Sequence, residues 1–118
     1  MSGVRNGYGE EEDSDGCKYN GVFKDNKKNG FGIEFMKKGT KVSVFEGQWV
    51  NDKKEGFAIM YSLDKPKRKK LAYWEDGERK FWINKRRKVK FQEGVDSINE
   101  SKLKMEELKA QCKGKFHH

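Results

Sequence analysis

Three segments of this chain repeat one pattern, in which an aromatic residue is followed eight positions later by a second aromatic. The pairs are Phe23 with Phe31, Trp49 with Phe57, and Trp74 with Trp82. Their first members lie 26 and then 25 residues apart, and a tiny residue stands two positions before each of them, at Gly21, Gly47 and Ala72. Such a period is typical of repeat architectures, in which each unit packs on its neighbours.

The match between units extends to further positions. Tyr19 and Phe45 each stand four residues before the first aromatic, and Gly30-Phe31-Gly32 aligns with Gly56-Phe57-Ala58. An earlier half-unit, Gly7-Tyr8-Gly9, fits the second half of the pattern, so the repeat begins in mid-unit near Met1.

Each unit is interpreted as a β-hairpin, because residues at even spacing lie on one face of a strand. Tyr19, Gly21 and Phe23 share a face, and the turn-forming links 25–29 and 51–55 join the two strands of successive units. Glycine at a fixed place inside a strand indicates a close approach, here expected from a ring of the next unit. The predicted fold is mainly β: a short array of antiparallel hairpins in a single twisted sheet, with rings stacked along one face.

A different pattern follows Gln92. Asp96 or Ser97 is placed to cap a helix of about 15 residues. One narrow apolar stripe is expected to make its contacts, formed by Ile98, Met105, Leu108 and Cys112. So thin a stripe needs a surface to dock on, and both the chain's own sheet and a partner protein remain open. The predicted division is a hairpin array over 1–92 (half-unit 6–16, units 17–39 and 41–63, degenerate unit 70–92) and a helix with tail over 93–118.

Composition points away from catalysis. The 118 residues are 33% hydrophobic and 39% charged, which leaves room for one domain whose burial depends on its aromatics. Both histidines are the last two residues, and Cys17 and Cys112 lack metal-ligand spacing, so we expect reduced thiols and no catalytic residue, metal or cofactor. The sequence has neither an export signal nor a run of 18 apolar residues, which predicts a cytoplasmic protein.

The net charge of +8 is concentrated in two runs that fall in predicted loops. Together they form a candidate contact patch, Lys67, Arg68, Lys69, Lys70, Lys85, Arg86, Arg87 and Lys88. Its open uses are a solvated hairpin tip, an acidic protein surface such as that of tubulin, anionic lipid, and nucleic acid or nuclear import. Nucleic acid is disfavoured because the aromatics are assigned to the repeat face.

The segments Tyr19-Asn20-Gly21-Val22-Phe23, Asn29-Gly30-Phe31-Gly32, Phe45-Glu46-Gly47-Gln48-Trp49 and Glu55-Gly56-Phe57-Ala58 resemble MORN (membrane occupation and recognition nexus) repeats. The resemblance covers residues 6–62 well and 71–84 poorly, since Lys70, Phe81 and Ile83 replace one aromatic and two glycines of the pattern. The repeat-defining residues are Tyr8, Tyr19, Gly21, Phe23, Gly30, Phe31, Gly32, Phe45, Gly47, Trp49, Gly56, Phe57, Trp74 and Trp82.

The resemblance implies a non-enzymatic scaffold, a structural subunit that contacts other proteins of a large complex, among them other repeat proteins or tubulin-associated proteins. The expected setting is the cytoskeleton, in particular the spokes and linkers of the axoneme of a cilium or flagellum. Two alternatives stay open: a membrane-recruitment module whose basic loops bind anionic phospholipid, and an accessory domain that acts in trans on an enzyme such as a lipid kinase.

Overall fold

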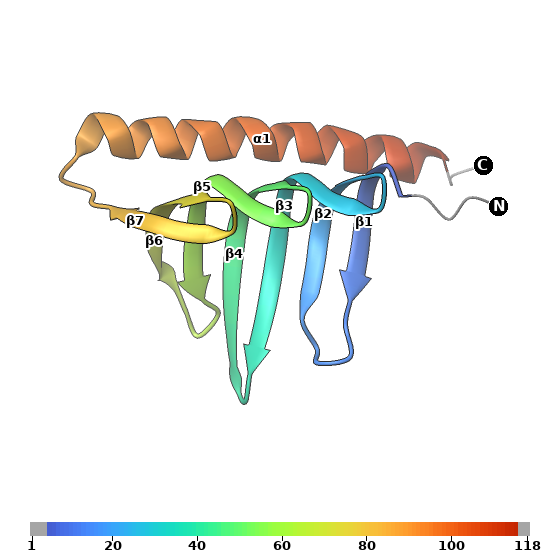
Figure 1. Cartoon of the computed structure of the whole chain (residues 1–118), viewed down its shortest axis with the longest axis horizontal. Coiled ribbons are helices and arrows are strands. Elements are labelled where there is room, and N and C mark those ends of the chain that lie inside the picture. The colour runs from blue at the N-terminus through green and yellow to red at the C-terminus, as the bar shows by residue number, and fades with distance from the viewer. Residues whose placement is uncertain (1–4, 116–118) are drawn as a thin grey trace.

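The strands of this protein pair in the order in which they occur along the chain. The computed structural model describes residues 5–115, with side chains for residues 5–111. The antiparallel sheet contains β1 (Gly7–Glu12), β2 (Lys18–Lys24), β3 (Lys27–Lys38), β4 (Lys41–Val50), β5 (Lys53–Ser62), β6 (Lys65–Glu75) and β7 (Glu78–Ile83). The helix α1 (Lys88–Lys115) then runs across the strands, from the β7 end of the sheet to the β1 end (Figure 1). The predicted hairpin array with a C-terminal helix is confirmed.

Three tight turns join β2 to β3, β4 to β5 and β6 to β7 at the end of the sheet nearest α1. Both residues of Asp25-Asn26 have positive φ (51° and 68°), and Asn51-Asp52 and Asp76-Gly77 repeat this geometry. Positive φ at both central positions is the type I′ turn, which matches strand twist and which Asn, Asp and Gly tolerate. These turns are two residues long, so Lys27 and Lys53 already belong to strands and the five-residue links expected from the sequence are too long.

A row of small residues crosses the sheet at one level. Strand pairing places in register Gly9, Gly21, Gly32, Gly47, Ala58 and Ala72, and the row ends at Trp82 on β7. The Tyr19 ring lies on this row, because a Cβ added to Gly32 would come within 2.2 Å of a ring carbon. At Gly32 the close approach thus comes from a ring of the same unit, whereas at Gly9 it comes from Phe23 of the next unit, as the sequence indicated.

Aromatic residues occupy both faces of the sheet, which corrects the expectation of rings along one face. The first aromatics of the units, with their upstream partners, form one cluster: Tyr19, Phe23, Phe45 and Trp49, with Trp74 packed against them. The second aromatics point to the opposite face, where Phe31 is buried and Phe57 is partly buried in a cluster shared with α1. Strand pairing aligns Phe31 with Gln48 and not with Trp49, and successive side chains of a strand point to opposite faces, so the two sets are separated.

The helix is longer than the sequence predicted. It begins at Lys88, so neither Asp96 nor Ser97 is its N-cap, and the last hairpin ends at Ile83 rather than near residue 92. Gly94 lets this early part of α1 approach the sheet, since a Cβ there would lie 2.7 Å from a methyl group of Leu71.

The predicted helix stripe makes contact within the chain. Ile98 and Met105 are 2% and 3% exposed in the cluster that includes Phe31, and Leu108 is half-buried. The Cys112 side chain lies outside the described residues. The open question of docking is settled: α1 packs on its own sheet, against strands β1 to β6. Although long, α1 is not apolar enough to cross a membrane, and no other helix occurs within residues 5–115.

Candidate functional site

The face of the sheet opposite α1, here called the open face, carries the first-aromatic cluster. Its rings meet edge to face in a continuous series from Phe23 through Tyr19, Trp49 and Phe45 to Trp74, with centroids 5.2 to 5.5 Å apart. Such T-shaped pairs match the positive edge of one ring to the negative face of the next. Within the described chain, the helix covers only the other face, yet these rings are buried: Tyr19, Phe23, Phe45 and Trp49 are each 2–3% exposed.

Cationic side chains lie over these rings at a repeated position. The guanidinium of Arg5 is 5.1 Å from the Phe23 centroid, the Lys28 ammonium is 4.9 Å from Trp49, and the Lys54 ammonium is 4.8 Å from Trp74. Arg79 continues the series 4.4 Å from Trp82. The four cations, Arg5, Lys28, Lys54 and Arg79, occupy equivalent places, each two residues before the late glycine of its unit or before Phe81, which replaces it. Their stems cover the rings and leave charge at the surface.

The type I′ turns hold three of these cations in place. The amides of Asn26, Asp52 and Gly77 each donate a hydrogen bond to the carbonyl of the cationic residue one unit earlier. The acceptors are Arg5, Lys28 and Lys54, at 3.1, 3.0 and 3.0 Å. Each turn is therefore tied to the preceding unit at the residue whose side chain covers the rings. Sequence reasoning missed this series, although a basic residue two before the late glycine recurs with the same period.

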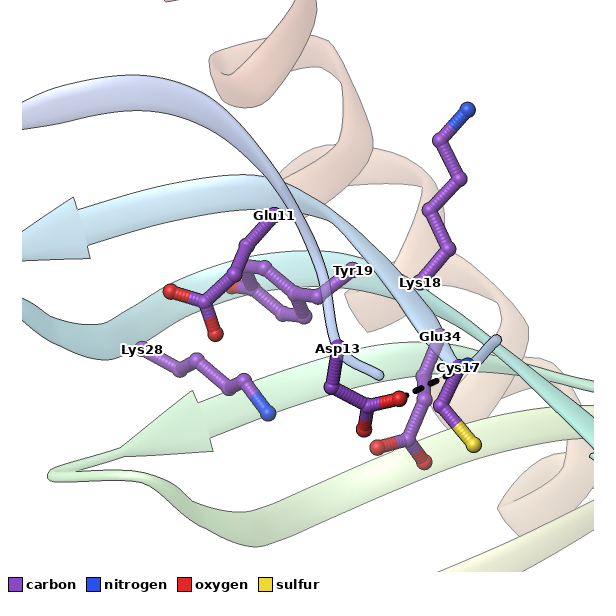
Figure 2. Close-up of a pocket in the computed structure, with 7 residues that line it drawn as sticks. All are labelled: Glu11, Asp13, Cys17, Lys18, Tyr19, Lys28 and Glu34. Carbon is purple, nitrogen blue, oxygen red and sulfur yellow. Dashed lines mark hydrogen bonds between the residues drawn. The ribbon is translucent and has the colours of Figure 1, made fainter. Parts of the chain in front are cut away.

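Carboxylates alternate with the cations on the open face. Glu11 pairs with Arg5 at 3.2 Å and Glu34 pairs with Lys54 at 3.1 Å. Between them lies a small hollow of about 50 Å³. Figure 2 shows the carboxylates of Glu11, Asp13 and Glu34 and the ammonium of Lys28 around the Tyr19 ring, with Lys18 pointing away. Asp13 accepts a hydrogen bond from the Cys17 amide at 3.0 Å.

This hollow lacks the properties of a catalytic or metal site. Burial, with the nearby charges of Asp52, Glu34 and Glu11, raises the pKa of Tyr19, and its hydroxyl donates to the Val22 carbonyl at 2.9 Å. A phenol held in its neutral form and already hydrogen-bonded is a poor general base. Among residues 5–111, no three His, Cys, Asp or Glu side chains are grouped so as to hold a metal ion, and Cys17 is a free thiol.

The contact patch of eight cations is placed differently from its prediction. Residues 67–70 belong to strand β6 and not to a loop, because the preceding turn is confined to Leu63-Asp64. Residues 85–87 do lie between β7 and α1, and Lys88 is the first residue of the helix. The two runs converge, since Lys69, Lys70 and Lys85 line one hollow of about 310 Å³. No ion pair is found for any of the eight within the part of the chain that the structure describes.

Comparison with known protein families resolves the identity of the repeat. The model of the MORN repeat matches residues 1–18, 19–41 and 45–63. The chain belongs to the MORN repeat family. No curated protein matches this MORN chain. MORN repeats are consistent with modules that bind proteins or membranes, and the family is not an enzymatic one. The β6–β7 hairpin lies beyond the matched residues but continues the same register, with Ala72 paired to Ala58.

A polar contact helps to seat α1 on the MORN sheet and makes a testable prediction. Glu46, 8% exposed, accepts a hydrogen bond from the Tyr61 hydroxyl and lies 3.5 Å from the Lys102 ammonium. Burial, then the hydrogen bond and charge of Glu46, raise the pKa of Tyr61 from 10.0 to about 12. The folded state therefore holds this proton more tightly than the unfolded state. The contribution of the protonated Tyr61 hydroxyl to the free energy of unfolding is complete below pH 10 and is lost as the pH rises towards 12.

We expect Tyr61 to ionise late in an absorbance titration of the folded protein, which has four tyrosines. The variant Tyr61→Phe should lose a tyrosinate step near pH 12 and keep the others. Tyr61→Phe should also flatten the decline in thermal stability above pH 10. An alkaline titration that is identical in shape for the two proteins, apart from one step near pH 10, would show that Glu46 does not hold the phenol neutral.

Proposed function

We propose that this MORN array is a non-enzymatic scaffold subunit that holds other proteins through its open face and its basic patch. One observation carries the proposal: the chain's own helix packs on one face of the sheet, while no helix or strand in residues 5–115 covers the other face, where a row of cations lies over buried rings. The surface that this face offers to a partner is therefore the row of cations and not the rings beneath them.

The setting that fits this proposal best is the cytoplasm and its cytoskeleton, with the ciliary axoneme as the specific location. The basic patch supports it, because eight cations without ion pairs in the described chain complement an acidic protein surface such as that of tubulin. Membership of the MORN family supports the same setting, because MORN proteins that resemble this one include subunits of axonemal spokes and linkers.

A tagged copy of the full chain is expected to co-sediment with detergent-extracted cytoskeletons from a ciliated cell. Neutralising Lys67, Arg68, Lys69 and Lys70 should move most of the protein to the supernatant. The matched control neutralises four other exposed lysines, Lys24, Lys37, Lys38 and Lys104, and should stay in the pellet. Recovery of the unmodified chain wholly in the soluble fraction would sink the cytoskeletal proposal.

The patch also favours a second candidate function, recruitment to anionic membranes. Each lysine or arginine near such a surface contributes about 1 kcal/mol, so four neutralised cations should abolish flotation with phosphatidylserine vesicles. Flotation of the unmodified chain combined with failure to co-sediment would favour the membrane function over the scaffold. Flotation that survives the four neutralisations would exclude the patch as the membrane contact.

A further inference from the structure

The net positive charge of this chain is concentrated at the β7 end of the sheet. Residues 65–90 contain 12 lysines and arginines and 3 acidic residues, whereas the other 92 residues contain 15 cations and 16 acids. Within the described residues, ion pairs engage only two of these 12 cations, Lys80 with Glu78 and Lys90 with Glu93. So one-sided a charge raises the local concentration of polyanions at this end of the molecule.

Two exposed aromatic side chains stand on β7 beside these cations. Trp82 is 44% exposed and Phe81 is 43% exposed. Because they are neighbours on one strand, they lie on opposite faces of the sheet. The Phe81 ring stacks on Tyr73 with centroids 5.4 Å apart, whereas the Trp82 ring has the Arg79 guanidinium at 4.4 Å and the Lys70 ammonium at 5.3 Å. Trp82 is therefore a ring at the surface that is held in place by cations.

Trp82 also lines an apolar hollow of about 310 Å³. Three other apolar side chains and three lysines complete its lining: Leu71, Ile83, Phe91, Lys69, Lys70 and Lys85. A flat apolar wall next to ammonium groups suits a planar ring joined to an anionic group, which is the chemistry of a nucleotide. The expectation that nucleic acid is disfavoured rests on aromatics assigned to the repeat face, and the exposed Trp82 beside lysines does not meet that condition.

The backbone at this end favours a partner that is recognised through side chains. Residues 66–69 form a bulge without a strand partner, because the pairing passes from Lys65 directly to Lys70. On β7, the register likewise passes over Lys80. An acidic peptide would therefore find no regular edge for the backbone hydrogen bonds of strand addition. A single strand of nucleic acid needs only contacts to its phosphates and bases.

We propose that the β7 end of the sheet binds single-stranded RNA. One base enters the hollow and stacks on Trp82, the phosphates beside it meet Lys69 and Lys85, and the other cations of residues 65–90 follow the backbone. Bases of a duplex are paired and stacked on each other, so double-stranded RNA is not a ligand. RNA is named and not DNA because of the proposed cytoplasmic setting. The inference goes beyond the scaffold proposal, although it uses some of the same cations.

The first experiment follows the anisotropy of a fluorescein-labelled, unpaired oligoribonucleotide of uridine and adenosine as the full chain is added. Trp82→Ala should bind it at least about fivefold more weakly, because the stacked base loses its ring. Phe81→Ala is the matched control: it removes an equally exposed ring of the same strand that does not line the hollow, and should bind like the unmodified chain. Trp82→Phe keeps a ring in place and should keep most of the affinity.

Tryptophan fluorescence reports the stacking directly. The chain has three tryptophans, of which Trp49 is 3% exposed and Trp74 is packed in the first-aromatic cluster, so Trp82 is the one that a base can reach. The RNA should quench part of the emission of the unmodified chain. This quenching should be absent from Trp82→Phe although that variant still binds. Quenching that persists in Trp82→Phe would place the RNA elsewhere on the molecule.

Salt dependence tests the phosphate contacts. For a single strand, the logarithm of the association constant falls with the logarithm of the salt concentration with a slope of about −0.7 per phosphate contact. The double variant Lys69→Ala with Lys85→Ala should therefore make the slope shallower by about 1.4. The matched double variant Lys38→Ala with Lys104→Ala removes the same charge at exposed sites that do not line the hollow, and should keep the slope.

Several results would overturn the inference. These are absence of RNA binding, equal binding by Trp82→Ala and Phe81→Ala, equal slopes for the two double variants, equal binding of double-stranded RNA, and tighter binding of single-stranded DNA. Displacement of the RNA by polyglutamate as effectively as by unlabelled RNA would assign this end to acidic proteins. Binding of phosphatidylserine vesicles but not of RNA would assign it to membranes.

The outcome for the RNA site is separable from that for the scaffold. If RNA does not bind, but the chain co-sediments with cytoskeletons that have been treated with ribonuclease, the scaffold function stands without this site. RNA binding without co-sedimentation would instead reject the cytoskeletal setting and leave the RNA site in place.

Discussion

Replacing Gly32 with valine is expected to lower the free energy of unfolding by about 3 kcal/mol or more, enough to unfold much of the protein. A Cβ at this position would lie 2.2 to 2.4 Å from two ring carbons and the hydroxyl oxygen of Tyr19, a residue that is 2% exposed. The ring is packed against Phe23 and Trp49, so it has no free space into which to move. Chemical denaturation followed by tryptophan fluorescence measures the loss.

The matched control is Ser43→Val, which places the same side chain at an exposed position of β4. This control should change stability by no more than about 0.5 kcal/mol. A double-mutant cycle tests the steric cause directly: Gly32→Ala should cost less when Tyr19 is already leucine, because the ring is then absent. If Gly32→Val is as stable as Ser43→Val, the ring does not rest on this glycine.

Truncating the helix contact is expected to have the second large effect. Ile98→Ala and Met105→Ala each remove a side chain that is 3% exposed or less in the cluster joining α1 to the sheet. Large-to-small substitutions in such a core cost about 2 to 4 kcal/mol, because the transfer energy is lost and a cavity remains. The urea midpoint should fall accordingly, and a dye that binds apolar surface should report the exposed sheet face at lower urea.

Leu103→Ala supplies the comparison on the same helix. Leu103 is 65% exposed, so its truncation should shift stability by about 0.5 kcal/mol or less. Similar losses for Leu103→Ala and Ile98→Ala would show that the helix does not dock through the stripe. Normal stability of Ile98→Ala with Met105→Ala combined would show that the sheet stands without its helix.

The features that the sequence predicted correctly are those that repeat. Tiny residues and aromatics at a fixed period predicted the hairpins, and the apolar spacing of Ile98 and Met105 predicted a docked helix. Period alone does not reveal which face a ring occupies in the assembled sheet, because that depends on the register between strands. The position of Phe31 on the helix side therefore follows from the pairing of β3 with β4 and not from the period.

Local composition and helix-capping rules predicted the wrong bounds for two elements, because each depends on tertiary contacts. The run of lysines after Leu63 has the composition of a loop, yet its ends, Lys65 and Lys70, pair with β5, and strand β6 includes the bulge between them. Helix capping rules favoured a start at Asp96 or Ser97, but tertiary packing of Phe91 against the sheet extends the helix to Lys88. The cation series was overlooked because lysine is so abundant in this chain that its periodic members do not stand out.

The cross-unit hydrogen bonds of the type I′ turns restrict the insertion of residues at one end of each hairpin. A residue inserted beside Asn26, Asp52 or Gly77 would break a bond to the previous unit and displace a cation from its ring. The far tips, 13–17, 39–40 and 63–64, already differ in length, although at one of them the Leu63 amide donates to the Val42 carbonyl at 2.9 Å. Drift in unit length, seen as spacings of 23, 26 and 25 residues between successive cations of the series, is therefore confined to one margin of the array. New segments can be acquired there without disturbing the rest.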